Sequence, residues 1–283
     1  MKLIALVDNS SYAPSVCDHA AWLANRIGAG VDIVHVLERK EDSTQIENLS
    51  GSIGLGARSE LLEELVELDA QKAKLAHKHG RAILEDAKAR VMDAGVSEVG
   101  IKLRNGDIVE TIVDFEGEAD LVVIGKRGEA SDFDRLLPGS NLEQLVRSCE
   151  KPVLVASRAF KPINRFLIAF DGGDSVTRAV DYLADHPAFS DIECELLAVS
   201  ARPAEIQQRL DAAAAKLQAA GYSVTSKIES GLPEEVISRE VKSDGYDLLI
   251  MGAFGHSRLR NMIVGSTTTE MIRACKIPIL MLR

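Results

Sequence analysis

Residues 247–268 read DLLIMGAFGHSRLRNMIVGSTT, and this stretch decides the fold. An apolar run leads into Gly252, nine residues separate the second and third glycines, and a helical pattern continues after Thr268. This order predicts a strand, a glycine-containing loop and the first turn of a helix. Glycines at a strand exit let the backbone approach a ligand, and a helix that opens with Gly-Ser-Thr presents N–H groups and a hydroxyl. A phosphate is the group best suited to such a place.

The same pattern occurs a second time, 127 residues earlier in the chain. Residues 120–128 read DLVVIGKRG, and residues 247–255 read DLLIMGAFG. Upstream, residues 2–8 (KLIALVD) correspond to residues 165–171 (RFLIAFD). Because the correspondence extends over whole domains, the sequence predicts an internal duplication.

The duplication divides the 283 residues into two domains, residues 1–158 and residues 163–283. Each is long enough to bury a core of its own. The linker between them is short and lacks a run of glycine and serine, so we expect the two halves to pack against each other.

Each half alternates apolar runs with helical segments, which is typical of a parallel sheet covered on both faces. The expected strands are residues 2–7, 31–37, 99–103, 121–124, 153–156, 166–170, 194–199, 224–228, 248–251 and 279–282. The expected helices include residues 14–27, 60–92, 107–115, 142–148 and 203–220, and Gly80 is the candidate for an interruption of the second helix. Residues 41–59 form a polar, glycine-containing insertion, which is interpreted either as a mobile surface loop or lid or as a ligand contact.

Charge and composition restrict the partners and the compartment. The formal net charge is −10 and the pI is near 5.2, which argues against a nucleic-acid partner. The first apolar run, residues 3–7, is too short for a signal-peptide core, and no stretch has the length of a membrane span. We therefore expect a cytoplasmic protein without a membrane partner.

The four cysteines form no CxxC pair, which disfavours a metal site or a disulfide framework. Cys149 and Cys275 each precede the last strand of their half, so a shared buried position is expected. A structural thiol is the main interpretation, and redox sensing is the alternative.

Three features together resemble the universal stress protein family: the glycine pattern after the fourth strand, the aspartate that ends the first strand, and the last strand with its proline. The resemblance covers nearly the whole chain, as a tandem two-domain member. It implies two Rossmann-like α/β domains of the adenine nucleotide alpha hydrolase-like kind. Each would be an open five-stranded parallel sheet of order 3-2-1-4-5 with helices on both faces. In many members ATP or AMP is bound at the carboxyl edge of the strands.

The second half is similar to the family at every motif position. Asp171 and Val199 match the positions that hold the adenine and the ribose, and the loop and phosphate cradle correspond to Gly252, Gly255, Gly265, Ser266, Thr267 and Thr268. The Ser266 hydroxyl can donate to a phosphate oxygen, and the helix N-terminus adds roughly half a positive charge. An aspartate that only caps the following turn is the alternative for Asp171.

The first half departs from the pattern. The matching residues are Asp8, Val36, Gly125, Gly128, Gly139, Ser140 and Asn141. Ten residues separate Gly128 from Gly139, and Asn141 is followed by leucine, so the threonine hydroxyls of the other copy are missing. Lys126 and Arg127 are candidates for phosphate contact. A vestigial site is the alternative.

The leading hypothesis is an adenine-nucleotide-binding stress-response protein that acts as a nucleotide-dependent regulator toward a protein partner that the sequence does not identify. ATP, AMP or ADP is the expected ligand, with Mg²⁺ held mainly by phosphates and water. No catalytic residue and no metal ligand is assigned. His256, beside the glycine loop, is weighed as a phosphate contact, a catalytic group or an exposed loop residue. The alternatives are a slow ATPase or nucleotidyl-transfer enzyme, and a nucleotide-free interaction scaffold.

The last strands of the two halves, residues 153–156 and residues 279–282, are short hydrophobic edge segments. Members of the family with one domain tend to pair through this strand. We therefore expect the two strands to adjoin within one chain as an intramolecular pseudo-dimer. Whether two chains also form a homodimer is left open.

Overall fold

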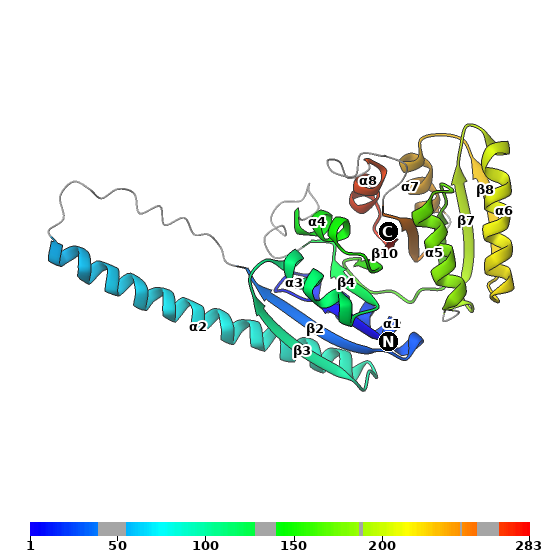
Figure 1. Cartoon of the computed structure of the whole chain (residues 1–283). Coiled ribbons are helices and arrows are strands. Elements are labelled where there is room, and N and C mark those ends of the chain that lie inside the picture. Colours follow the sequence, from blue (N-terminus) through cyan, green and yellow to red (C-terminus); the bar gives the residue numbers. More distant parts are fainter. Residues whose placement is uncertain (39–54, 128–139, 187–188, 244, 254–265) are drawn as a thin grey trace.

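A computed structural model describes residues 1–38, 55–127, 140–186, 189–243, 245–253 and 266–283 (Figure 1). For residues 55–62, 140–141 and 266–267 the description is limited to the backbone. Within these ranges ten strands form one continuous sheet of order β3-β2-β1-β4-β5-β10-β9-β6-β7-β8. Each half therefore has the order 3-2-1-4-5 that the sequence predicts, and the predicted fold class is confirmed.

The elements of the N-terminal half alternate as expected for a doubly wound sheet. They are β1 (Lys2–Leu6), α1 (Ala13–Ile27), β2 (Gly30–Leu37), α2 (Leu55–Asp93), β3 (Val99–Asn105), α3 (Ile108–Phe115), the 3₁₀ turn η1 (Glu116–Glu118), β4 (Leu121–Gly125), α4 (Ser140–Ser148) and β5 (Val153–Ala156).

The C-terminal half repeats this alternation. Its elements are β6 (Arg165–Ala169), α5 (Asp174–Asp185), β7 (Glu193–Val199), α6 (Pro203–Ala219), β8 (Val224–Glu229), α7 (Pro233–Ser243), β9 (Leu248–Gly252), α8 (Ser266–Ala274) and β10 (Ile279–Leu282).

The sheet has a hydrophobic core on each face, and each core extends through both halves. One core is formed with side chains of α1, α2, α5 and α6, and the other with side chains of α3, α4, α7 and α8. All four cysteines are buried, which confirms the buried position predicted for Cys149 and Cys275. Burial raises the pKa of the Cys17 thiol to about 12 and that of Cys275 to about 11, so both are inert thiols at neutral pH.

The two halves meet at an antiparallel pair of strands. Leu280 of β10 lies opposite Leu154 of β5 in the centre of this pair. Every other strand pair in the sheet is parallel. The predicted pairing of the two last strands within one chain is therefore confirmed, and it produces the only antiparallel step in the described sheet.

A second contact between the halves lies at α1. The Trp22 ring packs 5.7 Å from the Phe189 ring and 6.4 Å from the Phe160 ring of the linker. Next to it, the Arg26 guanidinium donates two hydrogen bonds to the Asp191 carboxylate, at 2.6 and 2.9 Å. These contacts confirm that the short linker joins two packed halves.

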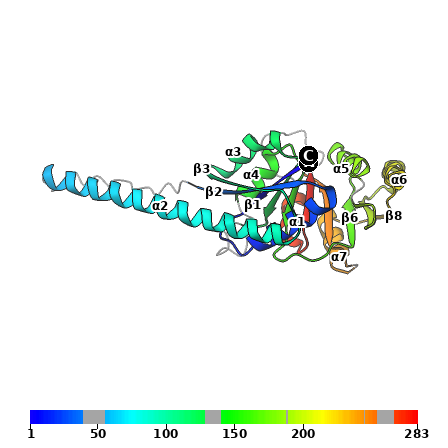
Figure 2. The same ribbon diagram turned by 90° about the horizontal axis from the view of Figure 1, so that it is seen from below.

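Helix α2 is the largest departure from the expected fold. The expected break at Gly80 is wrong, because the helix continues without interruption from Leu55 to Asp93. A Cβ on Gly80 would lie 2.8 Å from the His35 ring and 2.9 Å from a Leu103 methyl group. Glycine is needed at this position because a larger side chain would keep the helix from approaching the sheet. The helix continues through the glycine without a break. The N-terminal part of α2 projects away from the body of the molecule (Figures 1 and 2).

Candidate functional site

The candidate residues of the C-terminal half gather at one edge of the sheet. In the sheet register, Ala169 of β6 lies opposite Leu197 of β7 and Met251 of β9. Asp171, Val199 and Gly252 follow these three positions by one or two residues. They therefore lie together at the carboxyl ends of three adjacent strands, which is where open α/β sheets bind ligands.

The two aspartates that follow the first strand of each half have the same local role. One oxygen of Asp171 accepts a hydrogen bond from the Gly173 amide at 2.8 Å, and one oxygen of Asp8 accepts from the Ser10 amide at 3.0 Å. Both carboxylates thus shape the turn before the next helix. The turn-capping alternative is what the structure shows, and a ligand contact by the exposed Asp171 remains a prediction.

The first glycine of each motif lies against a helix of its own half. A Cβ on Gly252 would lie 2.9 Å from the Ser175 Cβ and 3.1 Å from the Val176 amide nitrogen. A Cβ on Gly125 would lie 2.9 Å from the Tyr12 Cβ. Tyr12 and Ser175 occupy corresponding positions of the duplication. These glycines therefore allow a strand exit to pack closely against the start of the following helix, a role that the sequence-based interpretation missed.

Helix α8 is fastened to the strand that precedes it. The Thr268 side chain is buried, and its hydroxyl donates to the Ala253 carbonyl at 3.0 Å. This bond holds the first turn of α8, which begins at Ser266, beside the exit of β9. The corresponding residue of the N-terminal half is the buried Leu142, so α4 lacks this tie.

Several candidate residues are not described at the level of side chains. Gly128, Gly139, Gly255, Gly265 and His256 lie outside the described residues. The backbones of Ser266 and Thr267 open α8, and those of Ser140 and Asn141 open α4, which begins two residues before the predicted start at residue 142. Val36, the next-to-last residue of β2, and Val199, the last residue of β7, are half-buried. The contact of these residues with a nucleotide stays a prediction.

The candidate sites of the two halves lie on opposite edges of the sheet. The strands are parallel within each half, and β10 runs antiparallel to β5. All strands of the C-terminal half therefore point opposite to those of the N-terminal half. A ligand at Asp171 and a ligand at Asp8 would lie on opposite sides of the molecule, in two separate sites.

Lys126 has a different role from the one considered in the sequence. Its ammonium group donates to the carbonyl oxygens of Cys275 at 2.6 Å and Arg273 at 3.2 Å, at the C-terminal end of α8. Arg283 makes the reciprocal contact with the Arg147 carbonyl at the end of α4, at 2.6 Å. Each half thus provides a cation for a helix C-terminus of the other half. Burial lowers the pKa of Lys126 to about 8.

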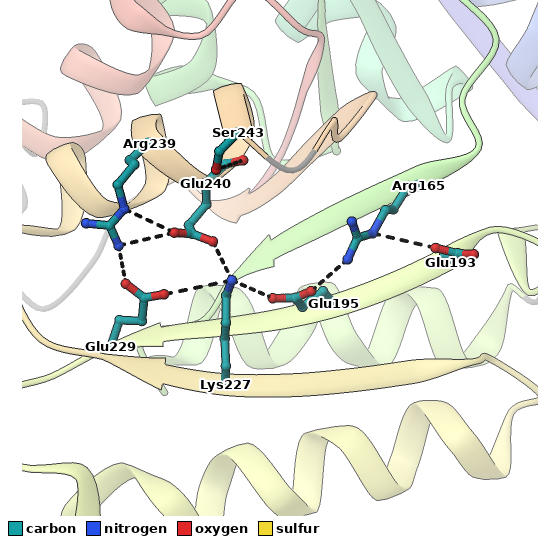
Figure 3. Close-up of polar contacts among 8 residues, drawn as sticks. All are labelled: Arg165, Glu193, Glu195, Lys227, Glu229, Arg239, Glu240 and Ser243. Atoms are coloured by element: carbon teal, nitrogen blue, oxygen red, sulfur yellow. Dashed lines mark hydrogen bonds and ion pairs between the residues drawn. The ribbon is translucent and has the colours of Figure 1, made fainter.

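Sequence reasoning also missed a charged cluster under α7 (Figure 3). The Lys227 ammonium group lies 3.1 Å from the buried Glu195 carboxylate and also contacts Glu240, which is buried as well. Arg165 approaches Glu195 to 3.0 Å from the other side, and Arg239 approaches Glu240 to 3.1 Å. Burial alone would lower the pKa of Lys227, but the hydrogen bonds to the two carboxylates raise it above its usual value.

A smaller version of the cluster occurs in the N-terminal half. Asp32 is buried between Lys2 and Lys102, at 2.9 and 3.0 Å. These three residues correspond in the duplication to Glu195, Arg165 and Lys227. Because the same charges recur in both halves on strands away from the strand exits, we interpret them as structural. The signal available in the sequence was the repetition of charge at corresponding strand positions.

Within the described residues, no group of three or more histidine, cysteine, aspartate or glutamate side chains is arranged to hold a metal ion. None of the described helices is long and apolar enough to cross a membrane.

The architecture defines a class: two doubly wound α/β domains in tandem, each with a glycine-rich strand exit and a helix N-terminus at its carboxyl edge. Comparison with known proteins agrees with this class. The sequence profile described as "Universal stress protein family" matches residues 1–157 and 196–283. The chain belongs to the universal stress protein family.

Individual relatives extend over the whole chain. The universal stress protein Slr1230 of Synechocystis sp. is 36% identical over 287 aligned residues, which cover 100% of both chains. The crystal structure of a universal stress protein from Archaeoglobus fulgidus is similar in fold, with a TM-score of 0.72 and 19% identity, and covers 100% of this chain and 98% of that one. A protein of unknown function from Pseudomonas aeruginosa has a TM-score of 0.64, 15% identity and coverage of 99% and 92%.

Proposed function

We propose that this protein binds an adenine nucleotide in its C-terminal half and acts in the stress response as a nucleotide-dependent regulator in the cytoplasm. The observation that supports this most directly is the position of α8, whose first turn is tied by Thr268 to the exit of β9. A helix N-terminus at the carboxyl edge of a parallel sheet favours a phosphate through its N–H groups and its dipole. Membership in the family is consistent with this proposal.

The proposed binding mode follows the order of residues along the edge. Ser266 and the backbone amides of the first turn of α8 would hold the phosphates. Asp171 and Val199, at the ends of the neighbouring strands, would contact the ribose and the adenine. Magnesium would accompany ATP through the phosphates and water.

The start of α4 in the N-terminal half can be compared with the start of α8. Helix α4 also begins with a serine at a strand edge, but Leu142 replaces the threonine that ties α8 in place. We therefore propose that the C-terminal site is the stronger of the two.

Native mass spectrometry of the full chain, with ATP, ADP or AMP and with and without magnesium, tests the proposal by counting nucleotides per chain. We expect Ser266→Ala to weaken binding roughly ten- to hundred-fold, because a hydrogen bond to a charged group contributes about 1.5–3 kcal/mol. Ser140→Ala is the matched control and should leave this site intact. If no nucleotide binds at millimolar concentration, or if Ser266→Ala binds as tightly as the wild type, the proposal is wrong.

A further inference from the structure

Helix α2 has 39 residues, and from residue 63 to residue 79 the body buries none of its side chains. All side chains of residues 63–79 are exposed, and burial begins at Gly80. This segment, which we call the α2 arm (residues 61–79), projects from the molecule in both views (Figures 1 and 2). At 1.5 Å per residue its 19 residues span about 28 Å.

The arm exposes large apolar side chains, which are unusual on a helix surrounded by water. The exposed fractions are 38% for Leu65, 69% for Val66, 47% for Leu68 and 68% for Leu75. Most of the stability of a protein helix comes from burying an apolar face, so a helix that exposes leucines in this way lacks its packing partner.

Four leucines of the arm, together with Lys72 and His79, have the spacing of a coiled-coil seam. Steps of four and three residues alternate through Leu61, Leu65, Leu68, Lys72, Leu75 and His79. Only two heptads and a half are present, and lysine occupies a central position, so a modest affinity is expected. The long aliphatic stem of lysine can cover such a seam while its ammonium group stays in water.

The charges of the arm are separated along its length. Residues 60–69 contain five acidic residues and no basic one, whereas residues 70–81 contain four basic residues and no acidic one. Two copies of this helix laid parallel would place acid against acid and base against base. Laid antiparallel, each acidic half meets a basic half, which favours association.

We propose that two copies of this chain associate through their α2 arms as an antiparallel helix pair centred near Ala70. In this register Leu65 faces Leu75 of the second copy, Leu68 faces Lys72, and Glu64 faces Lys78. Both symmetry-related sets form at once, as in any isologous contact. The antiparallel arrangement also places the two bodies at opposite ends of the pair.

The oligomeric state of the full chain tests the seam. Sedimentation velocity from about 1 to 300 µM should show the wild type moving from monomer to dimer. Leu75→Glu, in the seam, should weaken dimerisation at least tenfold. Val66→Glu is the matched control, because Val66 is exposed on the same helix but lies outside the seam, and it should dimerise nearly as the wild type does. Equal thermal stability of the variants verifies that the body is folded.

A charge exchange tests the direction of the helices. Glu64→Lys alone and Lys78→Glu alone should each weaken the dimer, because each places two like charges opposite each other. The double variant should restore the dimer, because the two exchanged side chains again carry opposite charges. Salt should weaken the wild-type dimer. A wild type that stays monomeric at 300 µM overturns the proposal. So does a Leu75→Glu variant that dimerises normally, or a Glu64→Lys variant that dimerises more tightly, as a parallel pair would.

Discussion

Gly252 and Ser175 lie so close that a Cβ added to the glycine would come within 2.9 Å of the serine Cβ. Gly125 and Tyr12 repeat this contact in the other half at the same distance. The exit of the fourth strand of each half is therefore pressed against the start of the first helix. The first glycine of each motif therefore also has a packing role.

Gly252→Ala should therefore destabilise the fold even without nucleotide. Overpacking of this kind costs about 1–3 kcal/mol, which urea denaturation of the apo protein would measure. Gly117→Ala is the control, because a Cβ at Gly117 meets no atom within 4 Å among the described residues. Removing the opposing Cβ with Ser175→Gly should recover part of the loss. A Gly252→Ala variant as stable as the wild type would refute the packing role.

The hydroxyl of Thr268 should matter for both stability and binding. Thr268→Val keeps the shape of the side chain but leaves the Ala253 carbonyl without its buried donor, so we expect a loss of about 1–2 kcal/mol in the free energy of unfolding. Nucleotide affinity should fall as well, because the start of α8 is no longer held at the strand exit. Calorimetry on the same samples gives both quantities. Thr269→Val, at the next helical position, should change them less.

Lys227 should be the most sensitive member of the charged cluster. Lys227→Met leaves Glu195 and Glu240 buried beside each other without the cation between them. Since the Lys227 side chain is partly exposed, we expect a loss of about 2 kcal/mol rather than the larger cost of a fully buried charge. Lys216→Met, which removes an exposed ion pair with Asp181, should change the stability little, because exposed ion pairs contribute little. Similar losses for both variants would contradict the assignment of a structural role.

His19 should make stability depend on pH in the acid range. Burial lowers its pKa below the usual 6.5, its Nδ1 lies 2.7 Å from the Ser15 carbonyl oxygen, and its Nε2 has no partner within the described residues. The unfolded chain therefore binds a proton at a higher pH than the folded protein does. Stability is retained above about pH 6.5 and is lost as the pH falls below it.

The test compares melting temperatures of the wild type and His19→Leu between pH 5 and 8. The variant should lose less stability on acidification than the wild type, whereas the exposed His77→Gln should follow the wild type. Identical pH profiles for the wild type and His19→Leu would exclude His19 as the titrating group.

Sequence reasoning succeeds in this protein where a local pattern repeats. The bounds of β5 and β10 are predicted as the structure has them, and their pairing follows from two hydrophobic edge strands in one chain. The strand order follows from the resemblance to the family. The positions of Ser140 and Ser266 at helix starts follow from the glycine-serine motif.

The features that were missed depend on contacts between distant segments. The continuous course of α2 through Gly80 is explained by His35 and Leu103, which approach it from other elements. Lys126 looks like a phosphate ligand beside a glycine loop, yet it reaches the carbonyl oxygens of a helix 147 residues away in the chain. The sequence alone does not distinguish a phosphate from the carbonyl oxygens as the partner of the Lys126 ammonium group, whereas the fold does.

The seam between β5 and β10 joins two domains that a peptide linker already holds together. Their pairing is therefore independent of protein concentration, in contrast to the pairing of two separate chains, which dilution reverses. Because the two halves are always present in equal number, neither half has to pair with a second copy of itself. One half can then change at its strand edge while it continues to serve as the other's partner, and the difference between Leu142 and Thr268 is of the kind that this permits.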